Sequence, residues 1–149
     1  MPRGTLEVIL ICAKDLRDSD FFSKIDPYVI LTYRTQEHRS SVAQGAGSNP
    51  SWNESFLFTV SDAASELKLR LFDKDTLTKD DFLGEVKIDL EPVFDVGAIP
   101  ETVYNVVKDN EYRGELKVAI TFNPEIGREL VFDEGESQIG GWRESVIEY

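Results

Sequence analysis

The sequence has 149 residues, of which 41% are hydrophobic and 11% aromatic, enough for one domain with a core of its own. A formal net charge of −12 argues against nucleic acid as a partner, and no apolar run approaches the ~20 residues of a membrane-spanning helix. The first residues match neither a secretory nor a myristoylation signal, and a single cysteine cannot form an internal disulfide, so we expect a cytoplasmic protein.

Alternation of apolar and polar residues predicts β-strands along most of the chain. Seven strands are predicted at residues 5–12, 28–33, 54–60, 66–72, 83–90, 101–107 and 114–122, and a weaker, polar edge strand at 38–44. In the first strand Leu6, Val8, Leu10 and Cys12 share one face, so Cys12 is expected in the core. Eight strands without a predicted helix favour an all-β fold, an eight-stranded antiparallel β-sandwich within residues 1–124.

The alternation ends at Pro124, and residues 125–149 read as an acidic tail. Seven Asp or Glu residues stand there against two arginines, with four glycines between them, a composition typical of a flexible segment. Four of its residues are unusual in a solvated tail: Trp142, Val146, Ile147 and Tyr149. A loosely ordered end and a docking segment therefore both stay open.

Two loops between predicted strands, at residues 18–28 and 72–84, are crowded with carboxylates. Their aspartates are Asp18, Asp20 and Asp26 in the first loop and Asp73, Asp75, Asp80 and Asp81 in the second. Aspartate is common in turns, but so many together repel one another unless a cation lies between them. Calcium takes six to eight oxygen ligands in irregular geometry and suits such a cluster.

An EF-hand does not explain the second loop. Counted from Asp73, positions six and twelve are Thr78 and Gly84, where that motif requires Gly and Glu. The flanking helices of an EF-hand are not predicted either.

Five short stretches, in their order and spacing, make the sequence resemble a C2 domain over residues 4–124. They are residues 4–8, 26–29, 49–56, 71–75 and 81–84. The whole chain also resembles the small single-domain plant proteins of the elicitor-responsive type, which suggests a role in defence signalling. Many C2 domains carry a strand before the equivalent of residues 5–12. Here residues 114–122 supply that strand, which implies the second, circularly permuted topology of the family.

The resemblance implies a calcium site with ligands at five positions: Asp20, Asp26, Asp73, Asp75 and Asp81. Such a ligand set implies about two Ca²⁺ ions. A backbone carbonyl of Ser19 or Lys74 and the hydroxyl of Thr78 would complete the coordination, while Asp18 and Asp80 would shape the local field.

Family members that recognise phosphoinositides carry a lysine-rich strand after the Asp-Pro-Tyr segment. This sequence has Arg34, His38 and Arg39 in that region, with Glu37 among them. Strong phosphoinositide specificity is therefore not expected.

Phe21, Phe22 and Leu77 stand at the centres of the acidic loops, where turn residues should be polar. They either fold back over the end of the sandwich or project from it and enter a bilayer. The second reading predicts calcium-dependent binding to phospholipid, with reversible recruitment of a monomer from the cytoplasm to the plasma membrane.

The alternative is a protein–protein interaction module whose loops calcium orders. An enzyme is not expected, because His38 is the only histidine and nothing near it resembles a nucleophile elbow.

Overall fold

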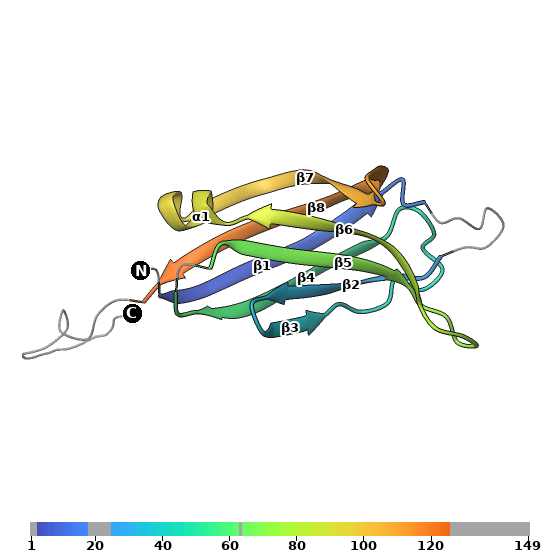
Figure 1. Ribbon diagram of the computed structural model, residues 1–149, viewed down its shortest axis with the longest axis horizontal. Helices are drawn as coiled ribbons and strands as arrows, with labels where there is room; N and C mark the ends of the chain where they lie inside the picture. Colours follow the sequence, from blue (N-terminus) through green and yellow to red (C-terminus); the bar gives the residue numbers. More distant parts are fainter. Residues whose placement is uncertain (1–2, 18–24, 63, 126–149) are drawn as a thin grey trace, which may run out of the picture.

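The computed structural model describes residues 3–17, 25–62 and 64–125. These residues form eight β-strands and one short helix (Figure 1). The strands are β1 (Gly4–Lys14), β2 (Pro27–Tyr33), β3 (Gln36–Arg39), β4 (Ser51–Val60), β5 (Glu66–Asp73), β6 (Asp81–Asp89), β7 (Ala98–Lys108) and β8 (Glu111–Pro124), and the helix is α1 (Glu91–Val96). In this part of the chain no helix is long and apolar enough to cross a membrane.

All strand pairs are antiparallel, in the order β3-β2-β5-β6-β7-β8-β1-β4. Within the described residues β6 and β7 pair only at Glu85 and Val107, so the sheet turns there into two facing four-stranded layers (Figure 1). β8 lies between β7 and β1 although it is the last strand. The predicted eight-stranded antiparallel sandwich is confirmed, with the strand order of the permuted topology.

The core lies between the two layers and is built by the inward-facing positions of alternating strands. Among its fully buried side chains are Leu6, Val8 and Leu10 of β1, Leu67, Leu69 and Leu71 of β5, and Leu116 and Val118 of β8. Burying one such side chain is worth ~1.5–3 kcal/mol. A shift of one residue would turn all of these side chains of a strand to the outer face, so the alternation fixes the register.

Cys12 is not the core residue that the alternation predicts. The pairing of β1 shifts between Leu10 and Cys12, as expected of a β-bulge. The extra residue moves Ala13 to the inner face, where it is 2% exposed, and leaves Cys12 half-buried opposite Lys117.

The two outer edges of the sandwich, β3 and β4, are joined by side chains. The Gln36 amide donates to the Thr59 carbonyl at 2.6 Å and accepts the Thr59 N–H at 2.8 Å, as a neighbouring strand would. His38 Nε2 lies 2.8 Å from the Leu57 carbonyl oxygen, and its ring packs on Phe58 with centroids 4.8 Å apart. His38 therefore has a structural role at this seam.

The predicted edge strand at residues 38–44 is misplaced, since β3 ends at Arg39. The Ser40 hydroxyl accepts the Val29 N–H at 2.8 Å, so a side chain takes the place of the next ladder carbonyl and the chain leaves the sheet. Ser40 is 4% exposed, which makes it a buried polar anchor for the following loop.

The structure also contains a short helix that the sequence pattern did not indicate. α1 has proline in its first turn and is capped by Gly97, whose φ of 101° suits glycine and whose N–H donates to the Val93 carbonyl at 2.8 Å. Val93 is its buried contact with the core. Six residues are too few for a helical period to show in the sequence.

Candidate functional site

Both acidic loops leave strands at the same end of the sandwich, opposite the ends of β1 and β8 where the described chain begins and ends (Figure 1). The β5–β6 loop is described in full, whereas the first loop is described from Ile25 onward. The predicted site residues Asp20, Phe21 and Phe22, with Asp18 and Ser19, lie outside the described residues. The other predicted site residues can be placed.

Strand register brings three of the predicted ligands to neighbouring strand ends. Pro27 of β2 pairs with Asp73 of β5, and Asp73 pairs with Asp81 of β6. Asp26 therefore adjoins Asp73 on one side, and Asp81 stands opposite it on the other. Side chains at directly paired positions have Cβ atoms roughly 4.5–5.5 Å apart. Residues separated by about fifty positions in the chain thus meet because the core fixes the register.

Hydrogen bonds tie these strand ends and the loop before β4 together. The Asp26 N–H donates to Asp73 Oδ1 at 2.8 Å, and the Asp26 carbonyl accepts the Lys74 N–H at 3.0 Å. Asp26 Oδ1 accepts the Gly45 N–H at 2.6 Å. Gly45 has a φ of 69°, a conformation that glycine adopts without strain. Asp26 is thus held by two neighbouring segments.

Asp75 closes its own loop. Its Oδ1 accepts the N–H groups of Leu77 and Thr78 at 2.8 and 3.2 Å, and its Oδ2 accepts the Thr78 hydroxyl at 2.7 Å. The Thr78 hydroxyl, followed by these N–H groups, lowers the pKa of Asp75 below its ordinary value. Asp75 is therefore ionised at neutral pH, with the Thr78 hydroxyl beside it.

Asp80, which the sequence suggested would act only through its charge, joins this loop to the sheet. Its Oδ1 accepts the Asp75 N–H at 3.0 Å, its Oδ2 accepts the Tyr28 hydroxyl, and Lys74 Nζ lies 3.8 Å away. The Asp75 N–H and then the Tyr28 hydroxyl lower the pKa of Asp80. Burial, and after it the hydrogen bond to Asp80, raise the pKa of Tyr28. Spacing alone does not reveal this contact.

The donor set fits calcium in chemistry, although the described residues do not complete a site. Among residues 3–17, 25–62 and 64–125 no three Asp, Glu, His or Cys side chains are close enough to hold a metal ion. The donors are nonetheless carboxylates with one hydroxyl, the oxygen ligands that calcium prefers. Asp73 opposite Asp81 also favours a cation, because like charges at paired strand positions are destabilising.

The match to known proteins agrees with this arrangement: residues 4–106 match the family model of the C2 domain. The chain belongs to the C2 domain family. It is 54% identical over 149 residues to 16 kDa phloem protein 2 of Arabidopsis thaliana, with all of both chains covered. C2 domains in general bind calcium and phospholipid membranes, and the family assignment supports a non-catalytic module.

Solved structures with the same fold include two with 30% or more identity to this chain. A C2 domain-containing protein from a putative elicitor-responsive gene is 58% identical, with a TM-score of 0.73, and the match covers 83% of this chain and 90% of that one. The resemblance to elicitor-responsive proteins is thereby confirmed. A calcium-bound pair of C2 domains from extended synaptotagmin 2 is 30% identical, with a TM-score of 0.68, over 82% of this chain and 46% of that one.

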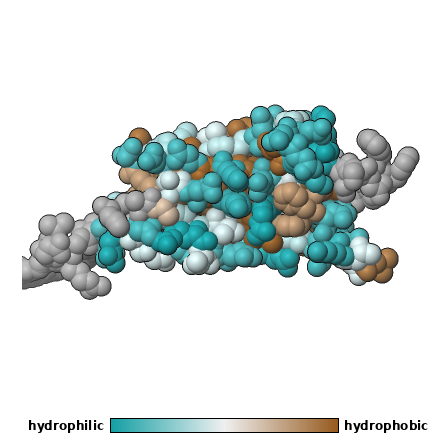
Figure 2. All heavy atoms as spheres, viewed as in Figure 1, coloured by the Kyte–Doolittle hydropathy of each residue, from teal (hydrophilic) through white to brown (hydrophobic). Residues whose placement is uncertain are grey.

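Leu77 lies at the tip of the β5–β6 loop of this C2 domain with 92% of its surface exposed. Figure 2 shows an apolar tip where this loop reaches beyond the sandwich. Of the two alternatives for this residue, the structure has the side chain projecting.

An aromatic row crosses the outer face of the layer below the loop. The rings of Tyr28, Phe72 and Phe82 lie on neighbouring strands, with centroids 5.6 Å apart in each adjacent pair. The Arg39 guanidinium lies 4.4 Å from the Tyr28 centroid, and its Nη2 donates to the Tyr28 hydroxyl at 2.9 Å. The base of the β5–β6 loop thus rests on stacked side chains.

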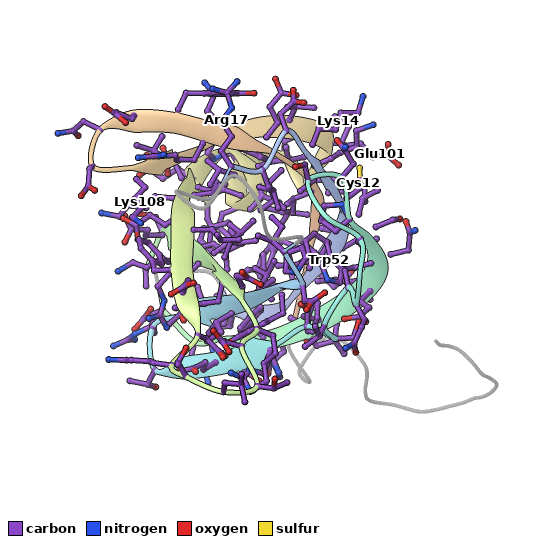
Figure 3. All side chains as sticks on the ribbon, turned by 90° about the vertical axis from the view of Figure 1, so that its right-hand side faces the viewer. Cys12, Lys14, Arg17, Trp52, Glu101 and Lys108 are labelled. Atoms are coloured by element: carbon purple, nitrogen blue, oxygen red, sulfur yellow. The ribbon has the colours of Figure 1, made fainter. Side chains whose placement is uncertain are left out.

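Several basic side chains at the loop end belong to the layer of β1, β7 and β8, which also carries Asp15 and Asp109 there. Figure 3 looks onto this end and shows Lys14, Arg17 and Lys108 toward the layer of β7, β8 and β1, away from the acidic β5–β6 loop.

Trp52, labelled in the same view, is 8% exposed and donates to the Ser41 carbonyl at 3.0 Å. Trp52 therefore anchors the loop before β4, as a core residue would.

Proposed function

We propose that this C2 domain binds phospholipid membranes in a calcium-dependent manner and moves reversibly from the cytosol to a membrane when calcium rises. The observation that carries the proposal is the register that sets Asp26, Asp73 and Asp81 at adjoining strand ends, beside a loop tipped by an exposed leucine. Similarity to the product of a putative elicitor-responsive gene supports a place in plant defence signalling.

The proposed ligands are Asp20, Asp26, Asp73, Asp75 and Asp81, which together contribute five negative charges to one end of the molecule. Binding of about two Ca²⁺ ions would reduce this charge to about −1 and offer open coordination positions to lipid phosphate oxygens. The loops would then no longer repel an anionic membrane surface.

Apolar contact would add to this electrostatic switch. Leu77 projects into solvent at the loop tip, and Phe21 and Phe22 of the first loop are proposed as its partners in the bilayer. Each such side chain is worth ~1.5–3 kcal/mol when fully inserted into hydrocarbon.

Liposome co-sedimentation across a calcium titration tests the proposal. Asp81→Asn is the informative variant, because Asp81 is exposed and stands opposite Asp73. Asp95→Asn is the matched control, since it removes the same charge from an exposed position on α1, away from the loops. We expect the wild type and Asp95→Asn to pellet with phosphatidylserine vesicles in calcium, and Asp81→Asn to require more calcium.

Two results would contradict the proposal in different ways. Wild-type protein that ignores vesicles while calorimetry detects calcium binding would favour a protein-interaction module with calcium-ordered loops. Wild-type protein that gives no calorimetric signal with millimolar calcium would remove the calcium site itself.

A further inference from the structure

The β5–β6 loop is fixed at its base by one carboxylate that faces the sheet. Asp80 accepts the Asp75 N–H with Oδ1 at 3.0 Å and the Tyr28 hydroxyl with Oδ2. Residues 75 and 80 bracket the loop, and the Asp75 side chain closes it from inside through Leu77 and Thr78. The position of the Asp75 main chain is therefore set by Asp80.

Tyr28 gives this contact a rigid partner. It is 2% exposed, its ring stacks on Phe72, and Arg39 covers it at 4.4 Å. Arg39 Nη2 donates to the Tyr28 oxygen at 2.9 Å, so the hydroxyl proton is left to be donated to Asp80. The hydroxyl that Asp80 accepts is therefore held in a fixed position by the packing of its ring.

Asp80 accepts one hydrogen bond from the main chain of Asp75 and one from Tyr28, whose ring is buried against the sheet. Asp80 is thus suited to hold a ligand residue in place. Tyr28 stands two residues after Asp26, and its hydroxyl reaches the loop that carries Asp75. This hydrogen bond therefore links the two proposed ligand segments.

We propose that Asp80 and Tyr28 are positioning residues, which hold the Asp75 loop in the geometry that calcium requires without binding the ion. The inference rests on the proposed function. It adds that the calcium affinity is set partly by a hydrogen bond on the sheet face, outside the ligand set.

Calorimetric titration of the full chain with calcium chloride tests this, using Tyr28→Phe. The variant keeps the ring and its stacking and removes only the hydroxyl. Hydrogen bonds to charged groups are stronger than those between neutral groups, and this one orders the loop that carries Asp75. We therefore expect calcium affinity on the order of tenfold weaker.

Tyr33→Phe is the matched control. Tyr33 stands at the other end of the same strand, is fully buried, and donates its hydroxyl to the Ala64 carbonyl at 3.0 Å. This variant loses one tyrosine hydrogen bond far from the loop, so its stability falls while its calcium affinity stays that of the wild type.

Asp80→Ala serves if Tyr28→Phe does not fold. It should weaken calcium binding at least as much, and Tyr28→Phe/Asp80→Ala should be no weaker than Asp80→Ala alone, because the hydroxyl acts through the carboxylate. Amide exchange in EDTA gives a second readout without calcium. The Asp75, Leu77 and Thr78 amides should exchange faster in Tyr28→Phe and not in Tyr33→Phe.

Wild-type calcium affinity in both Tyr28→Phe and Asp80→Ala would overturn the inference and leave the proposed function standing. A wild-type chain that binds no calcium would overturn both. An equal loss of affinity in Tyr33→Phe would show that the effect is general destabilisation, which also overturns the inference.

Discussion

Replacing Leu77 by alanine tests membrane contact separately from folding. The side chain is 92% exposed, so the folded protein gains almost nothing from it and should melt at the wild-type temperature. Leu77→Ala removes three carbon atoms, each worth about 0.8 kcal/mol on leaving water, or about 2.4 kcal/mol in all. Full insertion then corresponds to about fiftyfold in membrane partitioning, and half insertion to about sevenfold.

The assay is vesicle binding at saturating calcium, with calorimetric calcium titration on the same samples. Val96→Ala is the control, because Val96 is 80% exposed at the end of α1, on the opposite side of the molecule from the loop. The loss should persist in moderate salt, since screening weakens only the charge term. Vesicle affinity that Leu77→Ala leaves unchanged would refute the reasoning, as would an equal loss in Val96→Ala.

The two carboxylates Asp81 and Asp75 and the acidic tail can each be tested by one change. Asp81→Asn removes a carboxylate that stands opposite Asp73, so in EDTA the melting temperature should stay unchanged or rise, and a clear drop in calorimetry would assign Asp81 a structural role. Thr78→Val removes the hydroxyl that is the main cause of the lowered pKa of Asp75, so the NMR titration of Asp75 should move to higher pH. The stability that a lowered folded pKa provides is present at pH above the unfolded pKa and is lost as the pH falls. A chain that ends at Pro124 should keep the wild-type melting temperature, because the composition of residues 125–149 predicts a flexible tail, and a lowered value would show that the tail contributes to the fold.

The strands could be predicted because every second residue of a half-buried strand faces the core and is apolar, so burial appears in the sequence as alternation. Where the prediction fails, a local hydrogen bond or an extra residue overrides the period. The bulge before Cys12 shifts the inner face by one residue, and the Ser40 hydroxyl ends β3. The short helix after Leu90 could have been found from Pro92 in its first turn and Gly97 at its end, which are start and stop signals that need no period.

The candidate site, too, could be predicted only in part. The family resemblance assigned Asp26, Asp73 and Asp81 to one calcium site, and the strand register sets these residues at adjoining strand ends. Spacing could not predict which backbone N–H each carboxylate accepts. The link from Asp80 to Tyr28 joins residues 52 positions apart, and it depends on side-chain rotamers at the sheet surface.

The aspartates at the loop end differ in what a cation would have to displace. Asp75 accepts three hydrogen bonds within its own loop, so an ion must compete with the donors that keep it in place. Asp81 is exposed opposite a second carboxylate, so an ion there would relieve repulsion. Neutralising Asp81 should therefore cost affinity without costing stability, whereas changes at Asp75 affect both. Calcium at about a hundred times its dissociation constant raises the free energy of unfolding by about 2.7 kcal/mol through mass action. This gain is enough to outweigh the loss of one hydrogen bond.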